Sequence, residues 1–361
     1  MDNNNVLFIT AFHPGGRGFI GAGEAISEQH LELLFAQGKQ VHVLALAPAY
    51  QEASPEVVAL CASYTSVVHS RWMTFSALFN QLSNRSWIGP WFFTRMSPKA
   101  LHIIRQLLDQ YSISSIYLDF PSCLGFSSVF NHLPLHYIVH DVVTQKVERR
   151  PLLRVISQAI SCVESSLLER VSQCFVLSEK DALKCKGMGY SGRIDVVMPR
   201  NLKIGVVSDA APISDIVKRF AERKNLVFFG NMQRAENHYS ILRFLILCYP
   251  KIWIKHRDVQ FWILGLSPRK SLRALGLLLP GVKVVGAVDD PTLAFKESTF
   301  CIAPVYYGAG VKIKVLQMLD AGATVVSTPV GAEGIAQIEE LVTVDNDLLT
   351  STIINLLGNE A

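Results

Sequence analysis

Residues 300–335 read FCIAPVYYGAGVKIKVLQMLDAGATVVSTPVGAEGI, and this stretch predicts a single strand–turn–helix–strand unit. The apolar run 300–305 is typical of a buried strand, and the glycines that follow it predict a turn. Apolar residues then recur at helical spacing over 311–319, and the β-branched residues of 324–327 predict the next strand. Such a unit is typical of an α/β protein with a parallel sheet.

The turn and the helix start in this unit carry two positive charges. The turn at Gly308 and Gly310 aims backbone N–H groups and the positive end of the next helix at whatever lies above the sheet edge. Lys312 and Lys314 are expected in the first helical turn, where a cation is disfavoured by about 0.3–1 kcal/mol. A bound diphosphate would satisfy both lysines and the N–H groups. Two solvated lysines on an ordinary helix explain the spacing equally well.

The bulk composition is that of a globular chain. Of the 361 residues, 50% are hydrophobic and 18% are charged, which excludes a disordered protein and suffices for two domains. The formal net charge of +4 suits anionic ligands or an anionic membrane face. Without a long basic run, this charge argues against nucleic acid as a partner.

Cysteine usage and the start of the chain predict a cytoplasmic protein. The seven cysteines are scattered without a C-x-x-C pair, and several lie in apolar runs, which predicts reduced thiols in the core. The first residues, MDNNN, lead into a strand and do not resemble a signal peptide. No run reaches the roughly 18 apolar residues that a transmembrane helix needs.

The chain contains two series of alternating strands and helices. The first opens with a strand at 6–10, a glycine-rich loop, a helix at 24–37 and a strand at 41–46, which is a βαβ unit. The second begins with a strand at 226–229. Further strands are expected at 115–118, 137–139, 174–177, 195–198, 259–264, 282–285, 299–303 and 324–327.

The alternation breaks down between residues 199 and 225, where Pro212 interrupts the pattern. We therefore expect an amino-terminal domain over 1–205 and a carboxy-terminal domain over 206–361. Both are predicted to be doubly wound, Rossmann-like α/β domains that face each other across a cleft.

Residues 16–21 match the pattern G-x-G-x-x-G, but their context differs from that of a dinucleotide site. The motif starts six residues after the strand end, and the strand at 41–46 ends without the acidic residue that would hold a ribose. We expect Gly15 and Gly16 to belong instead to a substrate-binding loop, where glycine lets the backbone approach a ligand closely.

Four motifs of the second half occur in order between residues 227 and 335. They are VFFGNM at 227–232 followed by Asn237, GAVDD at 286–290, GAGVKIKVLQ at 308–317 and PVGAEGI at 329–335. Together they resemble the signature of retaining GT-B glycosyltransferases of family 4 (group 1), in particular the sugar-transferase branch of bacterial surface polysaccharide synthesis. The amino-terminal half matches in outline only. The resemblance implies that 1–205 is the acceptor-side domain and that 206–361 is the nucleotide-sugar-binding domain.

The resemblance implies a hexosyltransferase that needs neither cofactor nor metal, because lysines and N–H groups stabilise the leaving diphosphate of a nucleotide sugar. His140, which follows a predicted strand, is implied as the catalytic residue that contacts the donor sugar, although a histidine there also serves to cap a turn. Arg234 either reaches a phosphate or is solvated. The implied donor-binding residues are Gly15, Gly16, Gly230, Asn231, Arg234, Gly308, Gly310, Lys312, Lys314, Gln317 and Glu333.

Two departures from the family pattern keep alternatives open. Gln317 stands where a glutamate normally accepts hydrogen bonds from the ribose, and Ala309 stands where the motif has its first glutamate. The lost charge assistance is worth roughly 1 kcal/mol. A non-catalytic, glycosyltransferase-like binding subunit and a GT-B sugar-nucleotide epimerase remain alternatives to the transferase.

Residues 71–95 combine aromatic and basic side chains. They are Trp72, Phe75, Phe79, Trp87, Trp91, Phe92 and Phe93, interleaved with Arg71, Arg85 and Arg95. This pattern suits an anionic membrane surface or a lipid-linked acceptor, and an aromatic core segment explains it as well. The expected partners are thus a nucleotide sugar, a glycan or polyprenyl-linked acceptor and the inner face of the plasma membrane.

Overall fold

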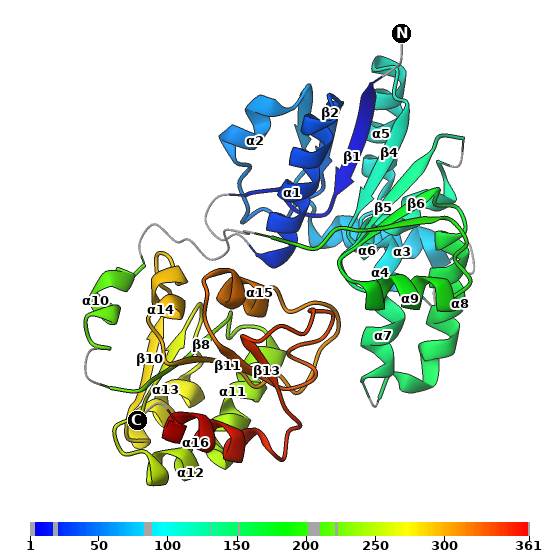
Figure 1. The fold of residues 1–361 in the computed structure, drawn as a ribbon. Helices are drawn as coiled ribbons and strands as arrows, with labels where there is room; N and C mark the ends of the chain where they lie inside the picture. Colours follow the sequence, from blue (N-terminus) through cyan, green and yellow to red (C-terminus); the bar gives the residue numbers. More distant parts are fainter. Residues whose placement is uncertain are drawn as a thin grey trace. The chain divides into compact units, whose positions relative to one another are not determined.

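The computed structural model describes residues 4–16, 21–82, 89–130, 132–150, 152–200, 210–220 and 223–359, and it divides the chain into two units, 1–199 and 200–361 (Figure 1). Each unit is a parallel sheet with helices packed on it. The expected domain border at 205/206 falls in the segment 201–209, which lies outside the described residues.

Unit 1 contains a seven-stranded sheet among its described residues, in the order β3-β2-β1-β4-β5-β6-β7. The strands are β1 (Asn5–Thr10), β2 (Gln40–Ala45), β3 (Ser63–Ser66), β4 (Ser115–Asp119), β5 (Leu135–Val139), β6 (Gln173–Val176) and β7 (Arg193–Val196). Every neighbouring pair is parallel. The central strands β1 and β4 are buried almost throughout, which explains why they read as continuous apolar runs.

The helices of unit 1 cover both faces of this sheet (Figure 1). They are α1 (Ala22–Ala36), α2 (Pro55–Leu60), α3 (Arg71–Leu82), α4 (Pro90–Phe93), α5 (Pro98–Gln110), α6 (Pro121–Leu124), α7 (Val143–Glu148), α8 (Ser157–Leu168) and α9 (Glu179–Gly187), with 3₁₀ turns η1 (Gly125–Ser128) and η2 (Arg154–Ile156). Local sequence explains several starts. In α5, Ser97 accepts a hydrogen bond from the backbone N–H of Ala100, and Pro98 occupies the first helical position.

Unit 2 contains a six-stranded parallel sheet within its described residues, in the order β10-β9-β8-β11-β12-β13. The strands are β8 (Asn225–Phe229), β9 (Gln260–Leu264), β10 (Val282–Gly286), β11 (Phe300–Ala303), β12 (Val325–Ser327) and β13 (Leu341–Thr343). The helices are α10 (Ile213–Val217), α11 (Ala235–Leu247), α12 (Tyr249–Lys255), α13 (Lys270–Leu278), α14 (Thr292–Lys296), α15 (Ile313–Asp320) and α16 (Leu349–Asn359).

Each face of the unit 2 sheet has its own apolar core. Leu226 and Phe228 of β8 pack into one cluster, which includes α11, α12 and α16. Val227 and Phe229 point the other way, into a second cluster that includes α14 and α15. Because successive side chains of a strand alternate between faces, a strand that is apolar throughout requires helices on both sides. The prediction of two doubly wound, Rossmann-like units is therefore confirmed.

The observed strands agree with the predicted ones apart from three differences. β3 and β13 were not predicted, and the strand expected at 195–198 lies at Arg193–Val196. β3 and β13 are edge strands paired on one side only, and the residues of β3 (SYTS) are polar and partly exposed. An edge strand of this kind lacks the apolar run by which the central strands are recognised.

The strand order reverses once in each sheet. β1 lies between β2 and β4, and β8 lies between β9 and β11, so the connections leave in opposite directions from these strands. In open α/β sheets, ligands bind beyond the carboxyl ends of the strands at such a reversal. The candidate residues are therefore sought after β1, β4 and β5 in unit 1 and after β8 and β11 in unit 2. None of the helices in the described ranges is both long and apolar enough to cross a bilayer.

Candidate functional site

The predicted glycine turn follows β11. Gly308 and Gly310 have φ angles of 119° and 71°, which a residue with a Cβ rarely adopts. The helix α15 begins at Ile313, so Lys312 is the N-cap residue and only Lys314 lies in the first turn. Lys314 was correctly expected in the first turn, but Lys312 lies one residue before it. The backbone at Gly310 is left-handed, and the helix begins only after it, at Ile313.

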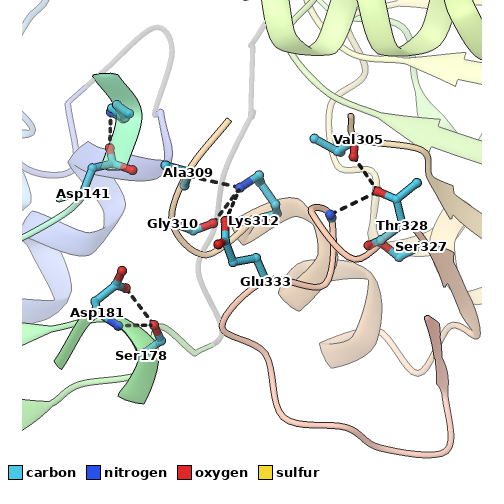
Figure 2. A network of polar contacts seen from close by, with 12 residues as sticks. Asp141, Ser178, Asp181, Val305, Ala309, Gly310, Lys312, Ser327, Thr328 and Glu333 are labelled. Atoms are coloured by element: carbon cyan, nitrogen blue, oxygen red, sulfur yellow. Dashed lines mark hydrogen bonds and ion pairs between the residues drawn. The ribbon is translucent and has the colours of Figure 1, made fainter. Parts of the chain in front are cut away.

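Lys312 folds back onto this turn, as Figure 2 shows. Its Nζ donates to the carbonyl oxygens of Ala309 at 3.1 Å and Gly310 at 2.6 Å. The same Nζ lies 3.8 Å from Oε2 of Glu333, which is buried. Lys312 therefore fixes the shape of the glycine turn, and Glu333 offsets part of its charge.

Lys314 lies beside the end of β8. Its Nζ donates to Oδ1 of Asn237 at 2.6 Å and stands 4.5 Å from the ring centre of Phe228. The pKa of Lys314 is lowered to about 7, mainly by burial and also by the positive charges of Lys312 and Arg234, against the opposing effect of Glu236. The positive charges around this amine thus outweigh the negative one, which favours an anion.

Asn237, on α11, joins the loop after β8 to α15. Its Nδ2 donates to the carbonyl oxygen of Asn231 at 2.9 Å while its Oδ1 accepts from Lys314. A Cβ at Gly230 would lie 3.0 Å from Nδ2 of Asn237, so glycine leaves room for the amide. The structure thereby brings together Gly230, Asn231 and Lys314. Asn237 follows the VFFGNM motif as part of the same signature, but the sequence alone did not assign it a role in the site.

The other predicted donor-binding residues of unit 2 surround this point. Arg234 is exposed at the N-cap of α11. Gln317 is half-buried on α15 three residues after Lys314, which places the two side chains on one helix face. In the loop before Glu333, the Thr328 hydroxyl donates to the Val305 carbonyl and accepts from the backbone N–H of Gly331 at 3.2 Å (Figure 2).

In unit 1, His140 follows β5 and is paired with a carboxylate. Its Nε2 lies 2.6 Å from Oδ1 of Asp119, the last residue of β4, and Asp119 is completely buried. The imidazole stacks on the ring of Phe120 with centres 3.9 Å apart and planes at 2°. Phe120 has a φ of 73°, an unusual backbone conformation for an aromatic residue.

Asp119 has two further donors. Its Oδ2 accepts hydrogen bonds from the hydroxyls of Thr10 at 2.7 Å and Ser27 at 2.6 Å. The three donors satisfy a carboxylate that has no access to water. Sequence reasoning named His140 as a candidate but did not name Asp119, although a lone aspartate at the end of an apolar strand in a parallel sheet is a usable signal.

The segment after His140 is anchored by a second buried carboxylate. Glu164 of α8 accepts the backbone N–H groups of Val143 at 2.9 Å and Thr144 at 2.8 Å, at the start of α7. Burial raises the pKa of Glu164, against the lowering effect of these hydrogen bonds. A capping carboxylate fixes the direction in which the chain leaves β5 and so helps to place His140.

Gly15 and Gly16 lie in the loop after β1. Gly15 has a φ of 56°, and a Cβ there would lie 2.7 Å from the Glu28 carboxylate. The Gly16 N–H donates to the carbonyl of His13 at 3.2 Å. The centre of the G-x-G-x-x-G pattern, residues 17–20, lies outside the described residues. Gly15, Gly16 and His140 thus belong to unit 1, and the other predicted site residues belong to unit 2.

The aromatic segment 71–95 divides into an exposed part and a buried part. On α3, Trp72 is 81% exposed, and Phe75 and Phe79 are each 63% exposed. In contrast, Phe92 and Phe93 of α4 are packed into the core of unit 1. Arg85 and Trp87 lie outside the described residues. Among the described residues of this segment, the exposed aromatic stripe therefore lies on α3, and the core interpretation holds for α4.

All seven cysteines are free thiols, and five of them are buried. Within the described part of the chain, no three His, Cys, Asp or Glu side chains are grouped so that they would hold a metal ion.

Comparison with known proteins supports the fold and finds a family match within the second unit. Residues 223–359 match the family described as Glycosyl transferases group 1. No curated protein matches the chain significantly in sequence.

Solved structures resemble the chain over nearly its whole length. Sucrose-phosphate synthase from Thermosynechococcus elongatus aligns with a TM-score of 0.66 at 15% identity, covering 98% of this chain and 89% of that one. Anabaena Alr3699/HepE, in complex with UDP and glucose, aligns with a TM-score of 0.62 at 14% identity, covering 99% and 90%. WaaG, a glycosyltransferase involved in lipopolysaccharide biosynthesis, aligns with a TM-score of 0.61 at 14% identity, covering 98% and 90%. The chain therefore has the GT-B fold, and residues 223–359 of its second unit match the group 1 glycosyltransferase family.

Proposed function

We propose that this protein is a retaining glycosyltransferase that transfers a sugar from a nucleotide-diphosphate sugar to a glycan or lipid-linked acceptor in bacterial surface polysaccharide synthesis. The observation that carries the proposal is the setting of Lys314, a partly buried amine flanked by Lys312 and Arg234 at the carboxyl edge of the unit 2 sheet. The complex of Anabaena Alr3699/HepE with UDP and glucose supports a nucleotide sugar as the donor.

The chemistry follows from where negative charge develops. When the bond to the sugar breaks, the leaving diphosphate gains charge, and Lys314 with the N–H groups of the Gly308–Gly310 turn stabilises it. Lys312 keeps this turn in shape, and His140 contacts the sugar. We propose that no metal ion or cofactor is required, since the cationic side chains supply the stabilisation.

The donor part of the proposal is tested by ligand binding to the full chain. A thermal-shift series with UDP, GDP, ADP, dTDP and CMP and their sugars should show one base that raises the melting temperature, because a ligand that binds only the folded state stabilises it by mass action. Lys314→Gln should abolish this shift. Lys251→Gln is the matched control, because Lys251 is exposed on α12, which precedes β9 at the opposite edge of the sheet. An equal shift in both variants would refute the assignment.

We also propose that the protein works in the cytoplasm at the inner face of the plasma membrane, with α3 as the contact. Trp72, Phe75 and Phe79 recur at helical spacing on an exposed face, and Arg71 starts the helix. The variant with all three aromatic residues changed to serine should lose binding to vesicles that contain anionic lipid, measured by sedimentation at low salt. Leu152→Ser, at a 91% exposed position outside α3, is the control. Retention of vesicle binding by the triple variant would exclude α3.

A further inference from the structure

Arg95 is a partly buried cation at the carboxyl edge of the unit 1 sheet. It follows α4, and its Nη2 donates to the carbonyl oxygen of Ala11, directly after β1, at 3.3 Å. Its Nε is shielded from solvent and has no hydrogen-bond partner in the described part of the chain. A guanidinium has five N–H donors, so most of its capacity is not used by this contact.

No carboxylate within the described part of the chain forms an ion pair with Arg95. The groups that interact with it most favourably are Cys123 and Tyr50, and burial raises the pKa of the Cys123 thiol, so that it stays neutral. Burying a cation without a partner costs free energy, which a bound anion would recover.

The nearby histidines add no compensating charge. Burial and the charge of Arg95 lower the pKa of His69 to about 4. Burial also lowers the pKa of His13, whose Nδ1 lies 2.8 Å from the Tyr64 hydroxyl. Both imidazoles are therefore neutral near pH 7 and do not compete for an anion, and His69 interacts directly with the guanidinium of Arg95.

A row of ring contacts connects Arg95 with His140. The guanidinium carbon lies 5.6 Å from the ring centre of Phe12, and Phe12 meets Phe120 edge to face with centres 4.9 Å apart. Phe120 in turn stacks on His140. Gly23 makes room for this row, because a Cβ there would lie 2.6 Å from the Phe120 ring. Arg95 and His140 thus stand at the two ends of one aromatic row.

We propose that Arg95 binds an anionic group of the acceptor, a phosphate or a carboxylate, and that the acceptor extends over Phe12 and Phe120 toward His140. A guanidinium is suited to this task because its planar fork matches both groups through two parallel hydrogen bonds. That the bound group belongs to an acceptor rests on the proposed transferase function. The anion site itself rests on the contacts of unit 1 alone.

The test uses the full chain with two probes, inorganic phosphate and glucuronate, measured by calorimetry and by the imidazole NMR signals of His69. At least one probe should bind the natural protein and shift the His69 signals. Arg95→Gln should weaken that binding at least tenfold and remove the shift, whereas Arg105→Gln, at an exposed position on α5, should change neither. Preference for phosphate or glucuronate identifies the anionic group.

Two outcomes overturn the inference: neither probe binds at millimolar concentration, or Arg95→Gln binds as tightly as the natural protein. Arg95→Lys serves as the second variant if Arg95→Gln fails to fold. It keeps the positive charge but loses the planar guanidinium, so it should bind the probe with an affinity between those of the natural protein and Arg95→Gln. Failure of the transferase function is distinguished by nucleotide diphosphates, which act through Lys314 in unit 2. If these do not bind while phosphate still shifts His69, the anion site stands without the transferase.

Discussion

Nε2 of His140 lies 2.6 Å from Oδ1 of Asp119, and the same carboxylate accepts the hydroxyls of Thr10 and Ser27. The three residues Thr10, Asp119 and His140 end or follow β1, β4 and β5, which are neighbours in the sheet. Because an ionised carboxylate only accepts hydrogen bonds, Nε2 of His140 carries the proton toward Asp119, and in the neutral ring Nδ1 is left as an acceptor. Asp119 acts as a positioning residue for the candidate catalytic histidine.

Asp119→Asn tests this relationship. The amide keeps the shape but removes the negative charge that His140 faces, and a hydrogen bond to a charged group is worth about 1.5–3 kcal/mol. We expect kcat to fall about 10- to 100-fold with KM for the donor nearly unchanged, measured by release of the nucleoside diphosphate. A kcat equal to that of the natural protein, in a variant with an unchanged melting temperature, would show that the pair is only structural.

The pKa of Lys314 predicts how donor binding depends on pH. Near pH 7 the free amine begins to lose its proton, and a bound diphosphate raises the pKa again, so binding above pH 7 takes up one proton. The affinity for the diphosphate should fall by about tenfold per unit as pH rises above 7. Calorimetry in buffers of different ionisation enthalpy measures this uptake. Lys314→Gln should bind weakly at every pH, with no proton uptake.

The same amine also affects the stability of the ligand-free protein. Its pKa in the folded state is lowered, so the unfolded chain retains the proton to higher pH than the folded one. The stability contribution of this group therefore increases as pH rises from about 7 toward the ordinary range of lysine. Lys314→Gln should have a flatter profile of melting temperature between pH 7 and 9. A profile parallel to that of the natural protein would contradict the lowered pKa.

Asn237→Asp should weaken donor binding. A carboxylate at this position would pair with Lys314 at the distance of the present 2.6 Å contact, raise the pKa of the amine and repel the diphosphate. We expect at least a tenfold loss of affinity, measured by calorimetry near neutral pH. Asn237→Ala is the control, because it removes the amide without adding charge and should cost less affinity. A larger loss of affinity in Asn237→Ala than in Asn237→Asp would show that Asn237 acts only by holding the loop after β8.

Gln317→Glu addresses whether the chain is an active transferase. The half-buried side chain lies on the Lys314 face of α15, and a carboxylate there accepts hydrogen bonds from ribose hydroxyls more strongly than an amide does. We expect turnover to be retained or increased about fivefold, corresponding to roughly 1 kcal/mol. If both forms bind the nucleotide sugar and neither turns it over, the chain is a binding subunit.

The sequence determined the α/β class, the two series of strands and the glycine turn. These are local properties: the apolar runs of β1 and β8 require burial on both faces, and the backbone at Gly308 and Gly310 requires glycine. The motifs between 227 and 335 are equally local, and they sufficed to indicate the group 1 domain.

The tertiary structure decided which side chains meet. Thr10 and Asp119 are 109 positions apart, and Asn237 and Lys314 are 77 positions apart, yet each pair forms a buried or partly buried hydrogen bond. Such contacts depend on strand order, because crossovers make strands adjacent that are distant in the chain. The lowered pKa of Lys314 and the unpaired charge of Arg95 have the same origin, since burial and neighbouring charges are set only once the strands are in place.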